Sequence, residues 1–118
     1  DNAEPIQLDD TGLKLLLNMV HLASEALPRG GRVDVYLEPT GDKVKITITA
    51  GGVGVTVHDD ALRAISGEMP VDELTARVVQ HHFANILARQ QGSKIGVDYP
   101  QADMLAIRAV ARRRELVG

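Results

Sequence analysis

Two neighbouring segments of alternating polarity constrain the fold more than any other feature of the chain. Residues 32–38 and 42–49 place apolar side chains at every second position, and the tetrapeptide "PTGD" joins them. A period of two is typical of a β-strand with one buried face, and Gly41 in the connection supplies the positive φ that a tight turn needs. The sequence therefore predicts a β-hairpin over these residues.

An unusually apolar helix is predicted before the hairpin, over residues 12–27. Asp9, Asp10 and Thr11 are candidates for its N-cap, and Pro28 with Gly30-Gly31 ends it. Apolar residues at helical spacing form two stripes, Leu13, Leu16, Leu17, Val20, Ala23 and Leu27 in one and Leu15, Met19, Leu22 and Ala26 in the other. Such a helix is either enclosed on two sides or presents one stripe to a ligand or partner.

The remaining elements complete an α+β pattern in one domain over residues 1–118. We expect a short helix at residues 58–66, a long helix at 71–91 begun by Pro70, and strands at 94–99 and 104–111. Hairpins separated by helices that can cover one face favour a two-layer α/β sandwich. The expected sheet is mixed but mostly antiparallel.

Composition excludes several classes of function. The chain has no cysteine, which rules out disulfides, thiolate metal sites and cysteine nucleophiles. No window approaches the ~20 apolar residues that span a bilayer, so no membrane partner and a cytoplasmic location are expected. The net charge is −3 and the basic residues are scattered except for Arg112-Arg113-Arg114, which disfavours nucleic acid as a partner.

The charged candidates for a site are few. His81 and His82 point to different sides of the expected helix and have no carboxylate or third histidine at helical spacing, so no metal ligand is assigned to them or to His21 and His58. Asp59-Asp60 opens the short helix, where two acids act as a cap and a dipole partner.

The glycine-rich stretch "AGGVGV", from Ala50 to Val55, resembles a phosphate loop but lacks the surrounding pattern. It has no third glycine of the dinucleotide fingerprint, no Gly-Lys-Ser/Thr, and no parallel return strand. A turn required by backbone geometry alone is the simpler interpretation.

The order of these features resembles the ATP-binding domain of sensor histidine kinases, a Bergerat-type fold. Asn18 stands at the first asparagine of the kinases' N-box, Pro28 and Gly30-Gly31 follow at the family's spacing, and Gly52 and Gly54 match the glycines of the Asp-x-Gly-x-Gly loop. Two residues of this chain depart from the pattern of the kinases.

Leu22 replaces the asparagine that helps to coordinate Mg²⁺, and Ala50 replaces the aspartate that reads adenine. The resemblance thus implies a degenerate pocket, at Asn18, Leu22, Ala50, Gly52 and Gly54, to which ATP and Mg²⁺ are not expected to bind.

A second resemblance fits this degeneracy. The string "LLLNMVHLASEALPRGGRV", with "AGGVGV" after it, is similar to the C-terminal domain of the ChpT-type histidine phosphotransferases of bacterial cell-cycle phosphorelays. That resemblance implies a longer protein, in which an N-terminal helical hairpin dimerises and carries the phospho-accepting histidine. The hairpin is expected to be missing from this chain, none of the four histidines matches the acceptor, and no catalytic residue is assigned here.

The role that the resemblance implies for this domain is docking. Receiver domains of response regulators and of a hybrid histidine kinase would exchange phosphoryl groups with the full protein while this domain holds them in position. Leu15, Met19 and Leu22, with the loop from Gly51 to Val55, either fill the former pocket from inside or form part of a contact surface. An interaction domain of another pathway and a working ATP-binding kinase domain remain as alternatives.

Overall fold

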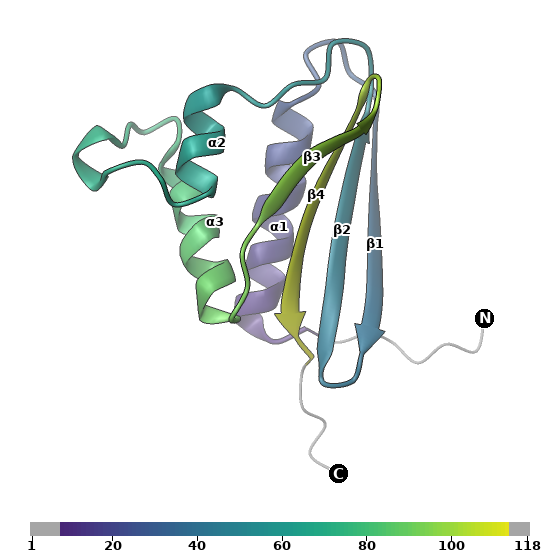
Figure 1. Cartoon of the computed structure of the whole chain (residues 1–118), viewed down its shortest axis with the longest axis vertical. Helices are drawn as coiled ribbons and strands as arrows, with labels where there is room; N and C mark the ends of the chain where they lie inside the picture. The colour runs from purple at the N-terminus through teal and green to yellow at the C-terminus, as the bar shows by residue number, and fades with distance from the viewer. Residues whose placement is uncertain (1–7, 114–118) are drawn as a thin grey trace.

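The computed structural model describes residues 8–113 as two layers, a sheet and a set of helices on one of its faces (Figure 1). Its elements in chain order are α1 (Asp10–Glu25), β1 (Arg32–Thr40), β2 (Lys43–Gly51), α2 (Asp59–Ile65), the 3-10 turn η1 (Val71–Glu73), α3 (Val79–Gln90), β3 (Gly96–Gln101) and β4 (Met104–Arg112). The predicted α+β class and two-layer sandwich are confirmed. Within the described residues no helix is long and apolar enough to cross a bilayer.

The four-stranded sheet has the order β1-β2-β4-β3. The predicted hairpin is present, with Val35 opposite Ile48, and the second hairpin joins β3 to β4. β2 and β4 connect the two hairpins along their full length, from Lys43 opposite Arg112 to Gly51 opposite Met104. Every pairing that the described strands make is antiparallel, so the sheet is not mixed.

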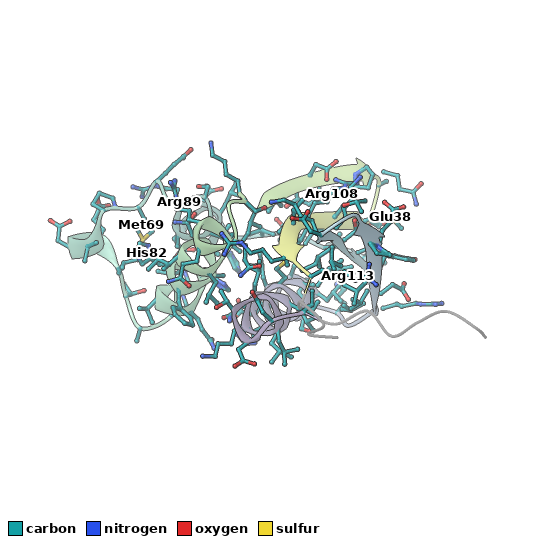
Figure 2. All side chains as sticks on the ribbon, turned by 90° about the horizontal axis from the view of Figure 1, so that it is seen from below. Glu38, Met69, His82, Arg89, Arg108 and Arg113 are labelled. Atoms are coloured by element: carbon teal, nitrogen blue, oxygen red, sulfur yellow. The ribbon has the colours of Figure 1, made fainter. Side chains whose placement is uncertain are left out.

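The core lies between α1 and the central strands. From β2 and β4 every second residue points to the helices and is buried, namely Val44, Ile46, Ile48, Ala50, Leu105, Ile107, Ala109 and Ala111. Leu15, Met19 and Leu22 of α1 fill the opposite side of this core. Figure 2, which looks from below, places Arg89 and His82 on the helix side of the molecule and Arg108 and Glu38 on the sheet side.

The two apolar stripes of α1 have different environments. The stripe that contains Leu15 and Met19 is buried, whereas in the other stripe Leu13 is 49% and Leu17 is 60% exposed. Leu16 and Val20 lie between these limits and pack on the rim of the core. α1 is therefore not enclosed on two sides.

The expected long helix over residues 71–91 is wrong at its N-terminal part. The chain makes the short turn η1, becomes extended at Leu74 (φ −69°, ψ 133°), and starts α3 only at Val79. Leu74 packs against a small separate cluster of Ala64, Met69 and Val78. The apolar periodicity over residues 71–91 therefore combines residues that pack in two separate clusters and does not mark one continuous helix.

Near the C-terminal end of β4, side chains accept the backbone N–H groups that have no strand partner, because β3 begins only at Gly96. Ser93 Oγ accepts the backbone N–H of Val110 at 2.9 Å, and Gln91 Oε1 accepts that of Arg112. The Gln91 amide also donates to the Asp9 carboxylate, 3.3 Å from Oδ1. Side chains before β3 thus replace the missing strand and tie the start of α1 to the sheet.

Candidate functional site

The glycine-rich loop leaves β2 and packs directly against the turn that follows α1. A Cβ at Gly52 would lie 2.5 Å from the Gly30 carbonyl oxygen and 2.9 Å from Leu27 Cδ2. A Cβ at Gly31 would lie 2.1 Å from the Gly51 carbonyl oxygen, so the two glycine pairs meet backbone to backbone. These contacts give the glycines a packing role that needs no ligand.

The other residues of the degenerate pocket do not form an open site. Leu22 and Ala50 are 1% and 0% exposed and belong to the main core. Asn18 is half-buried on α1, where its side-chain amide donates to the Lys14 carbonyl at 2.8 Å. The positions that the resemblance marks for Mg²⁺ and adenine are therefore occupied by packed apolar side chains.

The hollow that remains beside Leu22 is very small. Ala26, Val57 and Ala61 close it from neighbouring elements, and its volume is about 10 Å³. A cavity of that size holds one water molecule at most. A purine ring needs far more space, so this part of the molecule has no room for adenine.

Leu15, Met19 and Leu22 are core residues, so their side chains are not accessible to a partner in this structure. Their exposed fractions are 0%, 0% and 1%, because the stripe that carries them faces β2 and β4. A partner could reach them only if α1 left the sheet. Of the two expectations for these residues, the one in which they fill the former pocket from inside agrees with their burial.

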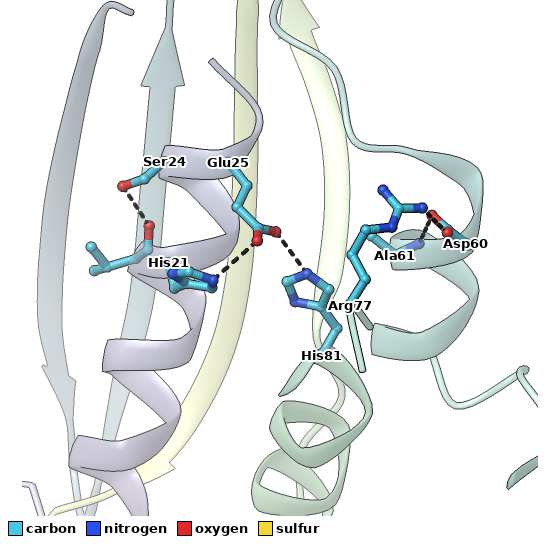
Figure 3. A network of polar contacts seen from close by, with 8 residues as sticks. His21, Ser24, Glu25, Asp60, Ala61, Arg77 and His81 are labelled. Atoms are coloured by element: carbon cyan, nitrogen blue, oxygen red, sulfur yellow. Dashed lines mark hydrogen bonds and ion pairs between the residues drawn. The ribbon is translucent and has the colours of Figure 1, made fainter. Parts of the chain in front are cut away.

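An open pocket of about 240 Å³ lies next to this filled region, between α1, α2 and the start of α3. Glu25, His58, Ala61, Arg77, Val78 and His81 line it. Figure 3 shows the polar groups that meet there from α1, from the N-terminus of α2 and from the start of α3.

Glu25 is the centre of these polar contacts. Its Oε2 lies 3.0 Å from His21 Nε2 one helical turn away, and its Oε1 lies 2.8 Å from His81 Nε2 on α3. His81 is 2% exposed, and the carboxylate satisfies a ring nitrogen that would otherwise be buried without a partner. The cluster joins α1 to α3 and so has a structural function.

Asp60, at the other side of the pocket, is held by two donors. Partial desolvation raises the pKa of this carboxyl, but the Ala61 backbone N–H at 2.8 Å and the Arg77 guanidinium outweigh it and leave the pKa below its usual value. Asp59 and Asp60 lie in the first turn of α2, as expected for dipole partners, although the N-cap position itself is His58.

Sequence reasoning missed the contact between Glu25 and His81. The spacing of His21 and Glu25, four residues apart on one helix, was the available signal, but His81 lies 56 positions further along. Within residues 8–113 no three histidine, aspartate or glutamate side chains are arranged to hold a metal ion. The arrangement therefore offers hydrogen bonding and packing, and no reactive centre is assigned to it.

Comparison with known proteins agrees with the fold. The profile of the histidine phosphotransferase C-terminal domain family matches residues 2–103. The chain is 32% identical over 100 residues to the protein phosphotransferase ChpT of Brucella abortus (strain 2308), a match that covers 85% of this chain and 48% of that protein.

A solved structure described as a bacterial phosphotransferase at 1.7 Å resolution superposes with a TM-score of 0.76 and 32% identity, over 86% of this chain and 49% of the other. The chain spans about half the length of both relatives. The match of the family profile over most of the sequence identifies this chain as a member of the histidine phosphotransferase C-terminal domain family.

Proposed function

We propose that this chain is the docking domain of a histidine phosphotransferase and works without ATP. In the full protein a phosphoryl group would pass from the aspartate of one receiver domain to a histidine outside these residues, and then to the aspartate of a second receiver. The receivers would belong to a hybrid histidine kinase and a response regulator in the cytoplasm. Dimerisation would reside in helices outside this chain.

The observation that carries this proposal is the burial of Leu22 and Ala50 in a chain that belongs to a family of phosphotransferases. A lost hydrogen bond to a charged group weakens binding by about 1.5–3 kcal/mol, and a lost metal ligand by at least as much. Together these losses lower ATP affinity by roughly 10²–10⁴-fold. The small hollow beside Leu22 adds a steric barrier to the same effect.

Two of the four histidines of this chain already have a ring nitrogen bound to Glu25, which favours a positioning role for them over a chemical one. A phospho-accepting histidine must expose a ring nitrogen to the incoming aspartyl phosphate. His81 is buried with its Nε2 on Glu25, and the Nε2 of His21 contacts the same carboxylate. This domain would therefore contribute orientation, which by itself can lower a barrier by several kcal/mol.

Calorimetric titrations test the proposal in two parts. Mg²⁺-ATP should give no saturable heat up to millimolar concentration, whereas receiver domains from the same genome should bind in the micromolar range. Saturable micromolar binding of Mg²⁺-ATP would overturn the first part. Failure of every receiver to bind, together with no transfer of labelled phosphoryl group by the complete gene product, would overturn the second.

A further inference from the structure

The face of the sheet that points away from the helices carries a cluster of positive charge. Residues paired across the sheet share a face, and Ile46 and Ile48 point into the core. The intervening residues of β2 and their partners on β4 therefore point outward, which places Lys43 opposite Arg112 and Thr47 opposite Arg108. No helix covers this face (Figure 1).

The basic patch consists of five exposed cations, Lys43, Lys45, Lys94, Arg108 and Arg112. Arg108 forms an ion pair with Asp98, and Glu38 stands opposite Lys45 in the sheet. Within residues 8–113 the other four cations have no carboxylate within ion-pair distance. The patch is thus positive although the whole chain has a net charge of −3.

One pair of like charges within the patch is unfavourable for the stability of the sheet. Lys43 and Arg112 are directly opposite on neighbouring strands, an arrangement in which like charges destabilise the pairing. Packing does not require either charge, because both side chains are exposed. A partner of opposite charge would relieve this repulsion.

The patch is also hollowed. A depression of about 210 Å³ lies where β4 continues below the start of β3, and Lys45, Lys94 and Arg108 line it together with Ser93 and Gly96. Lys45 and Lys94, which have no ion-pair partner among the described residues, border the depression and can contact the carboxylate of a protruding acidic side chain.

We infer that the basic patch is the surface on which an acidic protein face docks, and this rests on the proposed function, in which that face belongs to a receiver domain. An acidic protein face is complementary to this patch, because four of its five cations have no ion-pair partner among the described residues. Opposite charge steers encounter and fixes orientation, which is what a docking domain supplies. Nucleic acid fits less well, because phosphate backbones favour an extended basic surface and a basic domain.

Charge reversal with a matched control tests the inference in the complete gene product. The double variant Lys45→Glu/Arg112→Glu should bind receivers about tenfold or more weakly and lose most of its salt dependence between about 50 and 300 mM. Lys14→Glu, an exposed cation on α1, should bind within about twofold of wild type. Arg112→Glu removes the like-charge pair with Lys43, whereas Lys45→Glu creates one with Glu38, so the two effects oppose each other and the Tm of the double variant should stay close to that of wild type.

The possible outcomes separate the two proposals. Receiver binding that is unchanged in Lys45→Glu/Arg112→Glu would overturn the patch and leave the docking function standing. No receiver binding by the wild type, together with no phosphoryl transfer, would overturn both. Binding of duplex DNA or of phosphatidylserine vesicles, lost in the same variant while receivers bind unaffected, would assign the patch to a different partner and overturn the inference.

Discussion

Gly52→Ala tests whether packing, rather than a ligand, requires a glycine at this position of the loop. The new Cβ would lie 2.5 Å from the Gly30 carbonyl oxygen, a backbone atom, and 2.9 Å from the more adjustable end of Leu27. The loop cannot easily retreat, since the Gly52 N–H donates to the Asp103 carbonyl at 3.0 Å. Overpacking of this kind costs about 1–3 kcal/mol, and contact with backbone places this variant near the upper end.

Gly54→Ala is the matched control in the same loop. Gly54 has φ +77°, but its added Cβ would meet only Pro28 Cγ, at 3.8 Å. Only the backbone strain of a non-glycine residue at positive φ therefore applies, and the free energy of unfolding should fall by about 1 kcal/mol. For a chain of 118 residues, 1 kcal/mol corresponds to about 4 °C in Tm.

Calorimetry should therefore find Tm lowered by about 10 °C for Gly52→Ala and about 4 °C for Gly54→Ala, both without nucleotide. A Gly52→Ala protein as stable as wild type, or less affected than Gly54→Ala, would refute the packing explanation.

Three further perturbations follow from the pocket region. Leu22→Asn should lower the unfolding free energy in urea by about 2–4 kcal/mol, because it buries an amide without a partner, and should confer no Mg²⁺-ATP binding in titration. His81→Ala should cost about 2–3 kcal/mol through a lost buried ring and hydrogen bond, whereas Glu25→Gln, half exposed, should cost less than about 1 kcal/mol; equal losses would contradict the cluster's geometry. The depressed pKa of Asp60 means that its stabilisation is present above its reference value of 3.8 and is lost as pH falls through the lower folded value. Asp60→Asn should therefore be less stable than wild type at pH 7 and equally stable well below that value, as compared by urea midpoints.

Short-range sequence patterns were sufficient to predict the elements that depend on interactions between near neighbours in the chain. The hairpin of β1 and β2 and the end of α1 follow from alternation, a turn glycine and Pro28, all of which act between near neighbours. The boundary before α3 could not be predicted in this way. Leu74 continues the apolar spacing of a helix, yet it packs in a cluster separate from that of the helix, and only the tertiary structure distinguishes the two.

The same limit applies to the sites. Leu22 and Ala50 could be singled out because each stands at one position of a known motif, and both prove to be packed in the core. The basic patch was invisible, because Lys43 and Arg112 are far apart in the chain and the basic residues look scattered when read in order. Pairing of β2 with β4 brings them together, so the charge pattern belongs to the sheet register.

The strand order also has a consequence for how the chain reaches this structure. Each hairpin joins residues close in sequence and can form early, but the pairing of β2 with β4 must close a loop that contains α2 and α3. Loop closure of this kind is entropically unfavourable until the contacts form, and non-local pairing slows folding. The pairing of β2 with β4 is thus the expected rate-limiting step of folding. Substitutions at Ile48 or Ile107 should therefore slow refolding more than substitutions in the outer strand β1.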